Sequence, residues 1–182
     1  MKDNIPTDRL PLVTLLLIAG GVAGHVVLHA GGTLQLLADA MFLAIFGPSV
    51  EDSMSRVRFL VFCLLGAAAA AGVQLLLEPG SALATAAASG AVAAAVGGHA
   101  LLYRHARVVS VLLVPTLFRL FELPAWVLVG AWLALQPLLS GWDACAAQAA
   151  GFAFGLLAIH AFAQRRKVQS PSAPAGWAGS TA

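Results

Sequence analysis

The amino-acid sequence predicts an all-α polytopic membrane protein that crosses the bilayer six times, with both termini in the cytoplasm. Three observations support this prediction. Hydrophobic residues make up 60% of the 182 residues and charged residues only 10%, against roughly 25% charged in an ordinary soluble domain. Apolar windows of about 20 residues, the length that crosses a bilayer, recur along almost the whole chain. The basic residues all fall on one side of the resulting arrangement.

Each apolar run is predicted to be helical, because backbone polar groups inside lipid must be satisfied within their own segment. Pro48 and the acidic residues that follow it are predicted to close the second helix, and Glu-Pro-Gly at 78–80 to close the third. The amphipathic connector 108–122 is expected to dip into the membrane interface and to extend the fifth helix, which follows it. The predicted helices cover about 10–28, 32–47, 57–77, 82–103, 123–139 and 143–163.

The distribution of basic residues predicts the orientation. They lie before the first helix, in the second and fourth connections and after the sixth helix, while the first, third and fifth connections have none. Because cytoplasmic loops carry an excess of Lys and Arg, both termini are placed in the cytoplasm. The ten basic residues are Lys2, Arg9, Arg56, Arg58, Arg104, Arg107, Arg119, Arg165, Arg166 and Lys167.

The two ends of the chain carry no visible chemistry. Residues 1–9 are interpreted as a cytoplasmic N-terminal segment, residues 10–165 as a single membrane domain, and residues 166–182 as a disordered cytoplasmic tail rich in Ser, Pro, Ala and Gly. Lys2 and Arg9 ahead of a hydrophobic run also fit a cleaved signal peptide, although its removal would leave five spans.

Nothing in the sequence predicts a metal site, a small-molecule cofactor or a nucleic-acid partner. Cys63 and Cys145 are expected at opposite membrane faces, too far apart for a disulfide. The sequence contains no Cys/His spacing of the kind that binds zinc and no glycine-rich phosphate-binding loop.

Polar residues mark one level of the predicted bundle. The second, fourth and sixth helices all run from the outside toward the cytoplasm, and each has a polar residue shortly after its outer end. Gln35 and Asp39 lie about one and two turns into the second helix, Ser89 about two turns into the fourth, and Gln148 one to two turns into the sixth. We therefore expect one polar site in the outer leaflet, with Asp39 facing the bundle interior because a carboxyl group is costly in lipid.

Small residues at four-residue spacing predict close contacts between helices. Gly90, Gly97 and Gly98 lie on such ridges of the fourth helix, and Gly151 and Gly155 form the same pattern on the sixth. These small-xxx-small faces allow two helix backbones to approach closely.

Four stretches, in chain order, resemble the rhomboid family of intramembrane serine proteases. The stretch at 41–52, MFLAIFGPSVED, is similar to the end of the second rhomboid helix, and AASG at 87–90 resembles the Gly-x-Ser-Gly motif around the nucleophile. YRHARV at 103–108 followed by LPAWVLVGAWLALQ at 123–136 looks like the connector and fifth helix of bacterial members. AQAAGFAFG at 147–155 resembles the family's Ala-His-x-x-Gly-x-x-x-Gly signature. The resemblance covers the predicted membrane domain and implies a six-helix rhomboid-like bundle.

Carried over residue by residue, the resemblance places Ser89 at the nucleophile position and Gln148 at the position of the catalytic histidine. The family's His-x-x-x-Asn in the second helix, which helps to stabilise the oxyanion, corresponds to Gln35 and Asp39. Ala87 replaces the first glycine of the serine motif. The first connection is also much shorter than the partly embedded loop that rhomboids usually carry there.

These departures remove the expected catalytic base. A serine hydroxyl needs an adjacent base to become a nucleophile, and a neutral glutamine amide does not take up a proton near pH 7. An ionised Asp39 would repel the developing oxyanion instead of stabilising it. Among the histidines, only His29 lies at a suitable depth to replace the missing base. Its alternative role is that of an interfacial histidine in contact with solvent. Asp39 is a further candidate for the base. Otherwise Ser89, Asp39 and Gln148 are expected to form a buried network that joins three helices.

The sequence is therefore interpreted as a rhomboid-like pseudoprotease of the bacterial inner membrane that binds transmembrane segments of other proteins without cleaving them. The alternative is an active rhomboid serine endopeptidase that uses Ser89 with a non-standard base. A transporter or channel is the third hypothesis, which the sequence favours least. The cytoplasmic halves of the predicted helices offer few polar groups beyond Gln74, Gln136 and His160, and the first two of these lie at the outer ends of their helices. The expected partners are the lipid bilayer and transmembrane segments.

Overall fold

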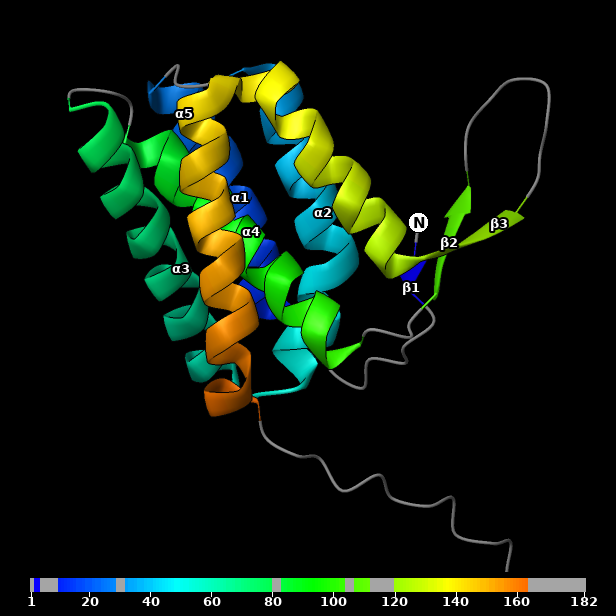
Figure 1. Cartoon of the computed structure of the whole chain (residues 1–182). Coiled ribbons are helices and arrows are strands. Elements are labelled where there is room, and N and C mark those ends of the chain that lie inside the picture. The colour runs from blue at the N-terminus through cyan, green and yellow to red at the C-terminus, as the bar shows by residue number, and fades with distance from the viewer. Residues whose placement is uncertain are drawn as a thin grey trace, which may run out of the picture.

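The computed structural model is a bundle of helices with a small sheet at its side (Figure 1). It describes residues 2–3, 10–28, 32–79, 83–103, 107–111 and 120–163. The helices are α1 (Leu12–Leu28), α2 (Thr33–Asp52), α3 (Arg56–Leu77), α4 (Leu83–Leu102) and α5 (Ala125–Phe162). The strands are β1 (Lys2–Asp3), β2 (Arg107–Val111) and β3 (Leu120–Pro124).

The last helix, α5, consists of two helical arms that meet at Gly141. Gly141 has φ 82° and ψ 170°, which breaks the helical backbone, and Figure 1 shows the two arms of α5 meeting in a tight turn. A positive φ of this kind favours glycine, which has no Cβ. With this break the described residues form six helical segments in the predicted order, which confirms the predicted fold class. Four of the segments are long and apolar enough to cross a membrane: Thr33–Asp52, Arg56–Leu77, Leu83–Leu102 and Gly141–Phe162.

Two local predictions were wrong. The second helix does not stop before Pro48 but continues through it to Asp52. Ser49, Val50 and Glu51 are buried, so their packing outweighs the cost of a proline inside a helix. The connector at 108–122 does not extend the fifth helix, because α5 begins at Ala125 and β3 precedes it. Its described parts are β2 and β3, which pair antiparallel, and β2 also pairs with β1. The β-branched valines of β2 favour this extended conformation.

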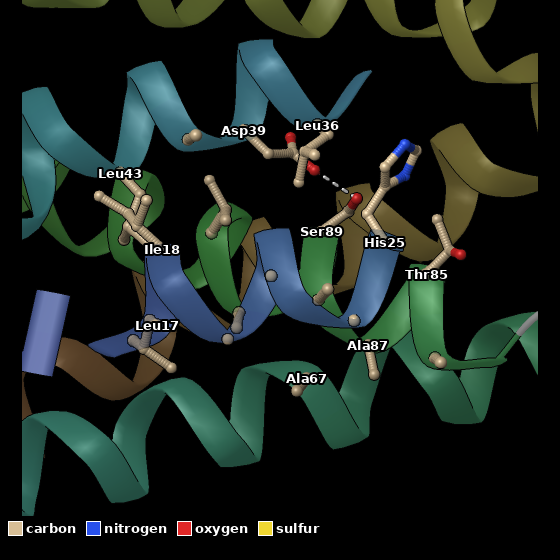
Figure 2. Close-up of a pocket in the computed structure, with 18 of the residues that line it drawn as sticks. Leu17, Ile18, His25, Leu36, Asp39, Leu43, Ala67, Thr85, Ala87 and Ser89 are labelled. Atoms are coloured by element: carbon tan, nitrogen blue, oxygen red, sulfur yellow. Dashed lines mark hydrogen bonds between the residues drawn. The ribbon is translucent and has the colours of Figure 1, made fainter. Parts of the chain in front are cut away.

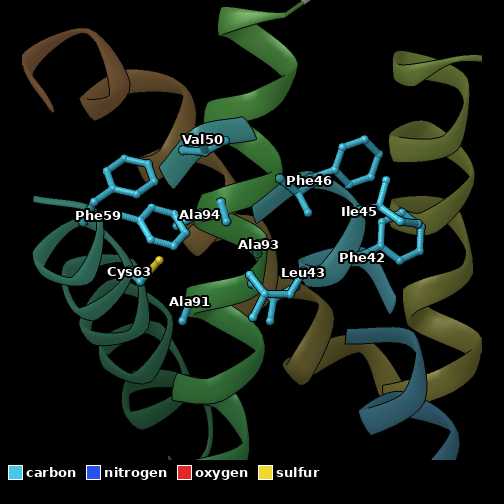
Figure 3. Close-up of a cluster of buried hydrophobic side chains, with 14 of the residues drawn as sticks. Phe42, Leu43, Ile45, Phe46, Val50, Phe59, Cys63, Ala91, Ala93 and Ala94 are labelled. Atoms are coloured by element: carbon cyan, nitrogen blue, oxygen red, sulfur yellow. The ribbon is translucent and has the colours of Figure 1, made fainter. Parts of the chain in front are cut away.

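The core of the bundle is built around α4. Every residue of α4 from Ser89 to His99 is buried, and α4 lies against α2, α3 and α5. Buried alanines of α4 belong to the same core cluster as Phe42 and Phe46 of α2 and Phe59 of α3 (Figure 3). A helix of small residues thus fills the centre of the bundle, and its neighbours supply the bulk.

The helices on either side of α4 approach its backbone closely. A Cβ atom at Gly151 would lie 2.6 Å from the carbonyl oxygen of Gly90, and a Cβ atom at Gly155 would overlap the carbonyl group of Ala94. A Cβ atom added at Gly90 would meet the side chain of Ala70. One added at Gly98 would meet the side chain of Ile159, and one added at Gly97 would meet the backbone of Phe152. The close approach sets the spacing of the helices that carry the polar residues.

Glu51, at the end of α2, holds the start of α1. Its buried carboxylate accepts hydrogen bonds from the backbone N–H groups of Val13 (3.1 Å) and Thr14 (2.9 Å) and from the Thr14 hydroxyl (2.8 Å). The first N–H groups of a helix have no partner within the helix, and the positive end of the helix dipole favours an anion. The sequence analysis treated Glu51 only as a helix terminator, because a cap supplied from another helix leaves no local pattern.

Replacing Glu51 with alanine is expected to destabilise the protein by about 2 kcal/mol, since it leaves buried donors without an acceptor. Unfolding in mixed micelles of a mild detergent and sodium dodecyl sulfate measures the change. Glu51→Gln keeps an acceptor oxygen and is the matched control, with an expected loss of about half that size. Equal stability of Glu51→Ala and the wild type would show that this cap contributes nothing.

Candidate functional site

The structure brings together the four polar residues that the sequence analysis assigned to the site. The carboxylate of Asp39 lies at their centre. Ser89 donates its hydroxyl hydrogen bond to Asp39 Oδ2 at 2.5 Å, Gln35 Nε2 donates to Oδ1 at 3.0 Å, and Gln148 Nε2 donates to Oδ1 at 3.5 Å. All four side chains are buried, and none is more than 8% exposed. Figure 2 shows the bond between Asp39 and Ser89 from α2 to α4.

Helix geometry and small residues produce this arrangement. Gln35 and Asp39 are four residues apart on α2, so they stack on one face of the helix, which continues inward as a buried apolar face. Ser89 is the first buried residue of α4. Gln148 lies one turn before Gly151, where α5 touches the backbone of α4 at Gly90. The glycine contact therefore brings the Gln148 amide within reach of Asp39.

The Asp39 carboxylate is the acceptor in all three hydrogen bonds. A carboxylate has about four acceptor positions, and three of them are used by Gln35, Ser89 and Gln148. Within this network Asp39 is the only group that can accept the proton of Ser89. The amide of Gln148 presents a donor to it, where a serine protease would present the imidazole acceptor. The two glutamine amide donors are also directed at Asp39 instead of at an empty position where an oxyanion would form.

His25, Thr85 and His99 lie at different positions relative to the hydrogen-bond network. His29, the predicted rescue base, lies outside the described residues. His25 and Thr85 line the same cavity as Ser89, and the sequence analysis assigned neither of them to the site, because this lining depends on how the helices pack around the cavity. His99 is fully buried further along α4, with its ring against Phe46. In the described part of the chain no group of three or more His, Cys, Asp or Glu residues could hold a metal ion.

Replacing Asp39 with alanine is expected to destabilise the protein by about 2 kcal/mol, because three buried donors lose their acceptor and each such bond in a membrane is worth roughly 0.6 kcal/mol or more. Ser89→Ala removes one donor from the same network and is the control, with an expected loss below about 1 kcal/mol. Unfolding in mixed micelles reports both values. If Asp39→Ala were no less stable than Ser89→Ala, the carboxylate would not be the centre of the network.

Comparison with known proteins gives one match. A family model described as the rhomboid domain matches residues 18–165, which is more than half of the chain and includes all four polar residues. No curated protein and no solved structure matches the chain.

Proposed function

This chain belongs to the rhomboid family, and from that premise we propose that it is a pseudoprotease of the bacterial inner membrane, which binds transmembrane segments of other proteins and does not cleave them. The chain is an integral membrane protein with apolar helices that contact lipid. The proposal concerns what the rhomboid bundle does in this protein when its serine lacks the family's histidine.

One observation carries the proposal: the Ser89 hydroxyl and the Gln148 amide both donate to Asp39. Gln148 occupies the position at which the rhomboid resemblance expects the general base, and an amide cannot take up the serine proton. In a serine protease the loss of the histidine alone costs about a millionfold in kcat. A carboxylate next to the nucleophile also opposes the negative charge of the tetrahedral intermediate. The polar residues are better suited to joining helices than to hydrolysis.

The proposal that the protein binds transmembrane segments is supported by its family membership and by the exposed side of α2. Leu34, Leu37 and Met41 are 63%, 61% and 46% exposed, and their spacing places them on one side of the helix, away from the buried Asp39 face. Such a stripe fits the side of another transmembrane helix, which would pack against it through van der Waals contacts.

A serine-reactive fluorophosphonate tests the absence of catalysis. Purified wild-type protein in nanodiscs is expected to label no more than Ser89→Ala. A photoreactive amino acid at Leu37 is expected to cross-link intact membrane proteins, while the same group at Leu76, an exposed position on α3, should cross-link fewer of them. Labelling of the wild type that disappears in Ser89→Ala would overturn the pseudoprotease proposal.

The 2.5 Å hydrogen bond between Ser89 and Asp39 favours a second candidate, an active intramembrane serine endopeptidase in which Asp39 is the base. In that case the wild type labels with the fluorophosphonate, and both Ser89→Ala and Asp39→Asn abolish the labelling. If labelling survived Asp39→Asn, the predicted rescue base His29 would be the next residue to replace.

A further inference from the structure

A cavity of about 340 Å³ lies between α1, α2, α3 and α4 and reaches the polar network. Asp39 and Ser89 form part of its wall, and Figure 2 shows both among apolar side chains that include Leu17 and Leu43. Most of the remaining wall consists of Ala, Gly, Leu, Ile and Val side chains. The cavity is therefore mainly apolar, and its polar lining residues are Asp39, Ser89, Gln35, Thr85 and His25.

We propose that this cavity binds a single-chain amphiphile whose head group donates hydrogen bonds, a long-chain alcohol or amine. The aliphatic chain lies along the apolar wall and the head group donates to Asp39. This inference goes beyond the proposed function, because the ligand is a small amphiphile and not a transmembrane segment.

The size of the cavity selects a single chain. At roughly 30 Å³ for each water-sized or methylene-sized group, the cavity holds about a dozen such groups. The cavity wall extends from Leu16 to His25 on α1 and from Ala84 to Val92 on α4, which is roughly 12 to 14 Å along each helix. An extended aliphatic chain matches this length.

The chemistry of the wall selects the head group. The three protein donors leave about one acceptor position free on the Asp39 carboxylate. The partners of this carboxylate in the described network are neutral side chains, so its charge is not balanced there. An alcohol or ammonium group adds the missing donor, and an ammonium group also adds the opposite charge. A carboxylate or phosphate head group would be repelled.

The test uses a dodecanol that carries a diazirine in its chain, with the full-length protein in nanodiscs. Photolysis is expected to label peptides of α1 and α4, and dodecanol or dodecylamine should compete at least about tenfold better than dodecanoate. Asp39→Asn is expected to remove this difference between head groups, since an amide no longer repels the dodecanoate.

Glycine substitutions provide the matched control. Gly24 lines the cavity and Gly72 does not, and an added Cβ would meet nothing within 4 Å at either position. Gly24→Leu fills roughly a third of the cavity and should lower the labelling about tenfold, while Gly72→Leu should leave it unchanged. Labelling that Gly24→Leu does not reduce, or equal competition by the alcohol, amine and carboxylate, would overturn the proposal by showing surface adsorption. The fluorophosphonate result does not affect this outcome, so the two proposals can fail separately.

Discussion

Gly155→Leu is expected to prevent the second arm of α5 from packing on α4 and to destabilise the protein by at least about 3 kcal/mol. An added Cβ atom at Gly155 would overlap the carbonyl group of Ala94, and its nearest neighbours are backbone atoms that cannot rotate away as a side chain can. The helices must then separate, which also draws Gln148, on the same arm, away from Asp39. Unfolding in mixed micelles should show the loss, and much of the protein is expected to aggregate during purification.

Gly130→Leu is the matched control for this prediction. Gly130 lies in the first arm of α5, and an added Cβ there would meet nothing within 4 Å. The two variants make the same change, one in each arm of α5, and only Gly155 has the backbone contact, so Gly130→Leu should unfold like the wild type. Equal loss of stability in both variants would mean that leucine harms α5 for a reason unrelated to the contact with Ala94.

The bundle could be predicted from the sequence because each of its determinants is local. Apolar length fixes the helices, and the four-residue spacing of Gly151 and Gly155 marks a close contact. Counting turns from the helix ends also places Asp39 and Ser89 at a similar depth, and the structure joins them by a hydrogen bond. A polar residue inside a membrane helix needs a partner, so few arrangements of these side chains are possible.

The features that sequence reasoning missed all depend on contacts between distant segments. The carboxylate of Glu51 caps α1 from a position 37 and 38 residues away from its partners. Pro48 stays within α2 because the residues after it are buried by other helices. The pairing of β1 with β2 brings Lys2 and Asp3 beside Val109 and Val108, which lie far along the chain. None of these features can be predicted from helix or strand propensity or from hydrophobic periodicity, because both describe only residues that are close in the sequence.

Restoring the histidine is expected to have the largest effect on chemistry. Gln148→His places an imidazole next to the network that holds Ser89, since Gln148 and Ser89 bond to the two oxygens of the same carboxylate. A positioned general base contributes about 10² to 10⁴ in rate, so the fluorophosphonate should label this variant at least about a hundredfold faster than the wild type. Ser89→Ala in the same background is the control and should abolish the labelling.

The neighbouring carboxylate is expected to limit this gain. The rhomboid resemblance implies an asparagine at the position of Asp39, and an asparagine side chain can donate a hydrogen bond to an oxyanion where a carboxylate repels it. Adding Asp39→Asn to Gln148→His should therefore raise the labelling rate by a further factor of about 10². If the double variant is folded, as judged by a cooperative unfolding transition, and still does not label, the absence of catalysis has another cause than these two positions. The direction of Ser89 or the short first connection would then be the next feature to test.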